Sequence, residues 1–127
     1  LTGAELAALV AENLRGSGSF YSLSGVRAAA RCDDGGLAVE LTRESGEPIG
    51  NDEVLRLATT DFLATLDGGP FAALGDDAIA VEDGPPVREA MVEALERRAG
   101  EVLRPEAFHD PARPRVGYPG ERPVRCE

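Results

Sequence analysis

Few side chains in this chain are of types that support catalysis, and those few are widely spaced. Its 127 residues include one histidine, His109, two cysteines and no lysine. Without lysine the chain cannot supply a Schiff-base amine, a P-loop lysine or the lysine of an SxxK nucleophile. A single histidine also excludes any mechanism that needs two imidazoles from this chain. His109 precedes Asp110 and could form a catalytic dyad with it, but a lone histidine in a proline-rich segment is typical of a surface position.

Acidic side chains are abundant, yet their spacing does not build a cation site. Calcium takes about six to eight oxygen ligands, which is more than any adjacent pair of carboxylates offers. We therefore expect these pairs to lie in turns and solvated loops. They occur at residues 33–34, 76–77 and 82–83.

An aromatic ring and a carboxylate stand close together beside a glycine-rich stretch. Phe62 is followed five residues later by Asp67, and residues 68–70 read GGP. A ring at the end of a strand, just before such a loop, can face a ligand, although a phenylalanine can equally belong to the core. Asp67 can contact a ligand or act as a turn residue that caps its own loop.

The two cysteines leave two states open. Cys32 and Cys126 fit neither zinc-ligand nor CxxC redox spacing. They form either one long-range disulfide, as in an exported protein, or two free thiols.

Charge limits the partners of the chain. Thirteen basic and 23 acidic residues give a net charge of −10, which opposes binding to nucleic acid or to an anionic membrane. No apolar run approaches the roughly 20 residues that span a bilayer. Residues 104–127 hold five of the nine prolines and five arginines against four acids, so the preceding residues carry −11. We expect a domain over residues 1–103 and an extended Pro/Arg-rich tail over 104–127.

Periodicity predicts the elements that position these residues. Thr2 and Glu5 form a capping-box pattern ahead of an apolar helical stripe that ends before Gly16. Strands are expected over residues 20–32 and 37–42, joined by the turn sequence DDGG. Further strands are expected at 54–60 and 78–81, and a second helix at 87–102. This order predicts an α+β fold with a mixed or antiparallel sheet flanked by two helices.

Three phrases resemble the C-terminal, substrate-recognition domain of the 5′-nucleotidase family. Residues 1–6 (LTGAEL) resemble its LTGxxL helix start, and residues 20–27 (FYSLSGVR) its FLQVSG strand. Residues 57–65 (LATTDFLAT) are similar to its VATN(D/N)FLA phrase, which continues into GGDG. Residues 46–49 (GEPI) and 113–116 (RPRV) fall where the family has a GxP(L/V/I) phrase and a closing G-R-(I/V) strand.

The resemblance implies a role for both candidate residues. In that family two aromatic rings sandwich the base, and the second ring corresponds to Phe62. The first lies in a PFG segment ahead of LTG, and we expect the present chain to begin after it. The family's aspartate binds the ribose hydroxyls six residues after the phenylalanine. Asp67 corresponds to this aspartate, but its two glycines follow it in the chain, whereas in the family two glycines precede the aspartate.

The resemblance also implies a larger enzyme. We expect nucleoside recognition for an exported, metal-dependent 5′-nucleotidase, located in the periplasm, outside the cell or on its surface. Two divalent metals of the Zn/Mn type would belong to a separate N-terminal metallophosphoesterase domain, and the present chain alone would be inactive and hold no metal. The alternative is a non-catalytic binding module that kept the fold and lost the nucleotide site. A truncated domain could also dimerise through its exposed cut surface.

Overall fold

The computed structural model describes residues 1–126, without the side chains of Asp76 and Ala107. Contacts group the chain into two compact units, which are treated separately below. The first unit joins Leu1–Arg56 to Pro111–Glu127, and the second is Leu57–Asp110. The predicted division into residues 1–103 and a tail stays a prediction, because it rests on composition rather than on contacts.

The first unit begins with helix α1 (Gly3–Arg15), as predicted. Its capping box is present: the main-chain N–H of Glu5 donates to Thr2 Oγ1 at 3.2 Å, and Glu5 Oε2 accepts from the Thr2 N–H at 2.6 Å. That main-chain hydrogen bond, with one from the Thr2 hydroxyl, holds the pKa of the Glu5 carboxyl below its usual value. The helix has one buried face, formed by Gly3, Leu6, Val10, Ala11 and Leu14.

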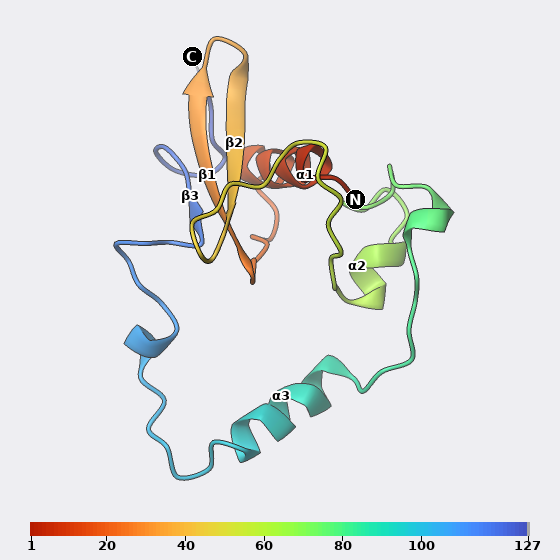
Figure 1. Cartoon of the computed structure of the whole chain (residues 1–127), viewed down its shortest axis with the longest axis vertical. Helices are drawn as coiled ribbons and strands as arrows, with labels where there is room; N and C mark the ends of the chain where they lie inside the picture. Colours follow the sequence, from red (N-terminus) through yellow and green to blue (C-terminus); the bar gives the residue numbers. More distant parts are fainter. Residues whose placement is uncertain (127) are drawn as a thin grey trace. The chain divides into compact units, whose positions relative to one another are not determined.

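A small mixed sheet follows, so the α+β class holds for the described chain (Figure 1). Strands β1 (Val26–Asp33) and β2 (Gly36–Arg43) pair antiparallel, with Val26 opposite Arg43 and Asp33 opposite Gly36. Their turn is the predicted DDGG, in which the Gly35 N–H donates to Asp33 Oδ1 and Gly36 has a φ of +107°. Strand β3 (Val116–Gly117) pairs parallel to β1, which gives the order β2-β1-β3.

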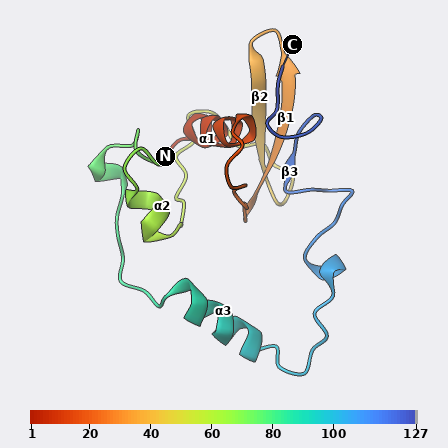
Figure 2. The same cartoon turned by 180° about the vertical axis from the view of Figure 1, so that it is seen from behind.

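The core lies between α1 and one face of the sheet (Figures 1 and 2). Period-two alternation on β2 sends Leu37 and Leu41 into this core, while Glu40 on the opposite face is exposed. The C-terminal segment contributes Val124, whose N–H donates to the carbonyl oxygen of Leu14 at 2.9 Å. The core residues are Leu6, Val10, Ala11, Leu14, Ala28, Leu37, Leu41, Ile49 and Val124.

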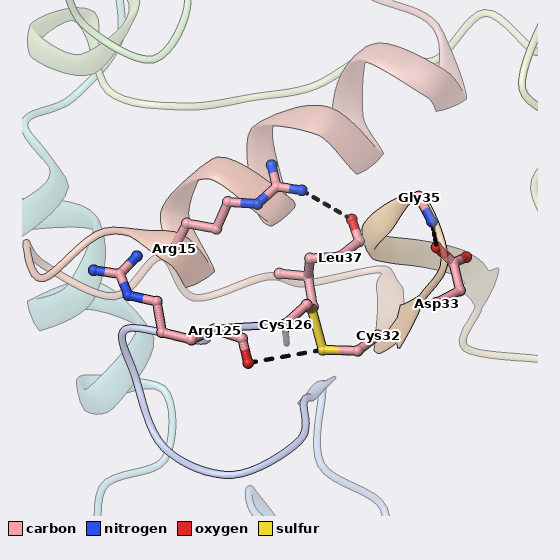
Figure 3. Close-up of a disulfide and its surroundings, with 7 residues drawn as sticks. All are labelled: Arg15, Cys32, Asp33, Gly35, Leu37, Arg125 and Cys126. Atoms are coloured by element: carbon pink, nitrogen blue, oxygen red, sulfur yellow. Dashed lines mark hydrogen bonds between the residues drawn. A yellow bond between two sulfur atoms is a disulfide. The ribbon is translucent and has the colours of Figure 1, made fainter.

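A disulfide joins Cys32 at the end of β1 to Cys126 in the C-terminal segment (Figure 3). The two Cα atoms lie 5.4 Å apart although the residues are separated by 94 positions. Nearby, Arg15 of α1 donates to the main-chain oxygen of Leu37 at 3.2 Å. Of the two states that the sequence allowed, the structure shows the disulfide.

The second unit has short helices and no strand among its described residues. It contains α2 (Asp61–Thr65), the 3₁₀ turn η1 (Asp76–Ala78), α3 (Val87–Glu96) and the 3₁₀ turn η2 (Pro105–Ala107). None of its described side chains is buried. Apolar side chains of α3, such as Met91 and Leu95, are therefore exposed within this unit.

Four predicted elements are wrong or too long. Only Val54 of the expected 54–60 strand pairs with another residue, forming an isolated bridge with Thr2, and residues 78–81 form no strand. A strand requires a neighbour along its length for its main-chain groups, and beyond the bridge between Val54 and Thr2 neither run pairs with a strand of the described chain. Residues 20–25 precede β1 without joining it, because Gly25 turns the chain with a φ of +81°. The second helix ends at Glu96, short of the expected residue 102.

Candidate functional site

Phe62 lies in the first turn of α2, and not at the end of a strand as predicted. Thr60 caps this helix by accepting from the Leu63 N–H at 3.4 Å, and the Phe62 N–H donates to Asp61 Oδ1 at 2.7 Å. The residue is 66% exposed, so it is not the core phenylalanine of the alternative interpretation. Its ring is therefore available to a flat ligand from solvent.

Asp67 lies in the tight turn that follows α2. The Gly69 N–H donates to the carbonyl oxygen of Leu66 at 2.8 Å and closes a turn in which Asp67 is the second residue. Gly68 has a φ of +66°, which favours glycine at the third position of such a turn. A side chain at position 69 would meet the Leu66 carbonyl oxygen at 2.7 Å, so glycine is required there as well. Asp67 itself is exposed and joins Phe62 in the same unit.

The loop geometry explains the order of residues in this part of the sequence. Both glycines are needed to make the turn, and the turn places the carboxylate ahead of them. Asp67 is thus a turn residue by its backbone, while its side chain can accept hydrogen bonds from hydroxyl groups. An exposed ring and an exposed carboxylate five positions apart in the chain form a candidate surface for a sugar-linked aromatic ligand.

The other chemical candidates stay apart. His109 is exposed, and its main-chain N–H donates to the carbonyl oxygen of Pro105 at 2.9 Å. Within the described residues, no three histidine, cysteine, aspartate or glutamate side chains gather where they could hold a metal ion. No helix in that part of the chain is both long and apolar enough to cross a membrane.

Arg122 of the C-terminal segment caps the C-terminal end of α1. This contact was not predicted from the sequence. The Arg122 guanidinium lies 5.0 Å from the ring centroid of Phe20, and that ring lies 6.2 Å from Tyr118. A cation at the C-terminus of a helix is favourable because the last carbonyls carry partial negative charge. This cluster therefore stabilises the fold at the C-terminal end of α1. Nη2 of Arg122 donates to the carbonyl oxygens of Asn13, Gly16 and Gly18.

Comparison with known proteins does not assign the chain to a family. No protein-family model matches it, and no match is found among curated proteins or solved structures. The 5′-nucleotidase resemblance thus stays a prediction from residues 1–6, 20–27 and 57–65.

Proposed function

We propose that this chain provides nucleoside recognition to an exported, metal-dependent phosphoesterase of the 5′-nucleotidase type. The observation that carries the proposal is the exposed ring of Phe62 at the start of α2, within the phrase that resembles the family's base-binding motif. An exposed ring offers a nucleobase a face on which to stack, and such stacking contributes about 1–3 kcal/mol with little demand for base identity.

The Asp67 carboxylate is the second part of the proposed site. A carboxylate accepts hydrogen bonds from vicinal hydroxyl groups, so it is suited to the ribose of a nucleotide whose base lies on Phe62. The turn of residues 66–69 holds its main chain, whereas its exposed side chain can turn toward a ligand. Base and sugar would then be recognised by neighbouring parts of one unit.

The described residues do not fit a two-metal centre, because they bring no three metal-binding side chains together. We propose that a separate metallophosphoesterase domain, the partner of this chain, holds the hydrolytic metals of the enzyme. The role of the present chain is to bind and orient the nucleoside part of the substrate.

Export of the protein is part of the proposal. The Cys32–Cys126 bond supports it, because disulfides persist in oxidising compartments such as the periplasm and the cell exterior. An acidic surface with a net charge of −10 is compatible with a small nucleotide held mainly through its base and sugar.

The test measures hydrolysis by the complete polypeptide that joins this sequence to a metallophosphoesterase domain, supplied with Mn²⁺. Phe62→Leu removes the aromatic face and should lower kcat/KM for AMP about 5- to 150-fold, the equivalent of about 1–3 kcal/mol of stacking. Glycerol phosphate has no ring to stack, so its hydrolysis should stay unchanged. Phe108→Leu is the matched control, because Phe108 is also a phenylalanine of the second unit and is 53% exposed.

Two outcomes would reject the recognition role. An equal loss with both substrates would mean that Phe62 acts on folding, and no loss with either would mean that the ring does not touch the base. If no nucleotide is hydrolysed at all, the second candidate function remains: a non-catalytic binding module. The observation that favours it is the position of Asp67 ahead of both glycines, where the family has its aspartate after them.

A further inference from the structure

The second unit is inserted between two parts of the first unit and is attached to it at both ends. Strands β1 and β2 precede the insertion, and β3, which pairs with β1, follows it. None of the insertion's described side chains is buried, whereas the first unit holds all nine core residues. Local opening is easiest where few apolar contacts must be broken. The insertion is therefore the part of the chain that can open while the core stays intact.

Two consecutive arginines lie where α3 ends. The helix stops at Glu96, residues 97–100 form turns, and Gly100 has a φ of +89°. The side chains of Arg97 and Arg98 are 65% and 43% exposed, and each makes one ion pair, to Glu93 at 2.6 Å and to Glu101 at 2.8 Å. Exposed ion pairs of this kind are weak and break readily. The Arg98 guanidinium also lies 5.1 Å from the ring centroid of Phe108. Both arginine side chains nevertheless keep exposed surface that a binding pocket of another protein can reach.

Elsewhere the chain offers poorer sites to a protease that cleaves after basic residues. It has no lysine, and three of its arginines precede proline, which such proteases do not cleave. Most arginines of the first unit lie in paired strands or donate to the main chain, as Arg15 does to Leu37 and Arg115 does to Leu23. Arg56 and Arg125 are exposed outside the strands, and Arg125 directly precedes the disulfide-bonded Cys126. Arg88 is exposed but stands in the first turn of α3, so cleavage there requires the start of the helix to unwind. The arginines followed by proline are Arg104, Arg113 and Arg122.

We propose that Arg97-Arg98 is a processing site for a trypsin-like endoprotease, and that cleavage converts the chain into a disulfide-linked two-chain protein. Hydrolysis of the Arg98–Ala99 peptide bond adds one water, breaks the C–N bond, and leaves a carboxylate on Arg98 and an ammonium group on Ala99. The two products are residues 1–98 and 99–127, and the Cys32–Cys126 bond joins them.

The contacts of the C-terminal product explain why the two chains should stay folded together. It retains β3, whose register with β1 pairs Val116 with Ala28, and it retains Val124 in the core. Arg122 continues to cap α1 through the carbonyl oxygens of Asn13 and Gly16. None of these contacts involves a residue of the insertion. The proposal does not depend on nucleoside recognition.

The experiment is limited digestion of the intact, oxidised chain with trypsin, read by mass spectrometry and by electrophoresis with and without dithiothreitol. We expect cleavage after Arg97 or Arg98 to be at least about tenfold faster than at any first-unit arginine, because cleavage of a folded chain follows the population of opened states. The cut protein should run as one species without reductant and as two with it. Its far-UV circular dichroism should keep the signal of the first unit.

Three variants make the test specific. Arg97→Gln combined with Arg98→Gln should abolish the fast cut, whereas the control Arg88→Gln should leave its rate unchanged. Cys32→Ser should separate the two products without reductant. Fast cleavage in the first unit, or a first unit that unfolds once the insertion is cut, would overturn the proposal.

Discussion

Removal of the Cys32–Cys126 bond should cost the first unit much of its stability. The bond spans 94 positions, and a cross-link lowers the entropy of the unfolded chain in proportion to the logarithm of the loop length. For a loop of this length the chain-entropy relation gives about 4.7 kcal/mol at 25 °C. Folded proteins are stable by about 0.05–0.15 kcal/mol per residue, or about 4–11 kcal/mol for the roughly 70 residues of the first unit. The stabilisation by the cross-link is thus comparable to the entire free energy of unfolding at the lower end of this range.

The measurement is guanidinium unfolding followed by circular dichroism, with the native chain compared with Cys32→Ser, Cys126→Ser and the double variant. Each single variant should lose as much free energy of unfolding as the double variant, because either substitution removes the same bond. The midpoint temperature should fall by roughly 20–40 °C, at about 4–8 °C per kcal/mol for a domain of this size.

A loss below about 2 kcal/mol would refute the reasoning, because it lies under the usual range for a long-range disulfide. Additive losses in the two single variants would refute it as well, since they would show that each cysteine acts through its own packing. A useful comparison is the native chain in dithiothreitol, which should match the double variant once the bond is reduced.

Two further changes test helix α1 through the free energy of unfolding. A methyl group at Gly3 would overlap the carbonyl oxygen of Gly50 and lie 3.2 Å from Ile49 Cγ2, so Gly3→Ala should destabilise by about 1–3 kcal/mol, whereas Gly18→Ala, with open space around it, should not. The pKa of Glu5 is lowered on folding, so its carboxylate stabilises the fold above the unfolded value of about 4.5 and loses this effect as pH falls through the folded pKa. Glu5→Gln should therefore be less stable than the native chain at pH 7 and equal to it near pH 2 in urea titrations; a gap that persists in acid would contradict this assignment.

Interactions between near neighbours could be predicted from the sequence. The capping box depends on Thr2 and Glu5 alone, and the β1–β2 hairpin on the DDGG turn and the alternation that follows. Each of these signals lies within one segment, so the residues that form the structure are read together. The helix, the hairpin and the α+β class were predicted for this reason.

Features that depend on distant partners could not be predicted. The run at 54–60 has the residue types of a strand, but only the fold shows that no strand lies beside it. Nothing near Arg122 indicates that it caps a helix 106 or more positions away. The helical position of Phe62 could have been predicted from the sequence, because Thr60 followed by Asp61 is a helix start signal. The apolar run before it favoured a strand instead.

The parallel pairing of β3 with β1 also dictates when the protein can reach its native state. Val124 and Cys126, the partner of Cys32, are synthesised more than 90 positions after strand β1. Until then the newly made helix and hairpin present Leu14 and Ala28 without their cover. Contacts between sequence-distant segments form slowly, and incomplete sheets are prone to aggregation. A chaperone that shields the nascent hairpin should therefore raise the yield of native protein more than one that acts after release.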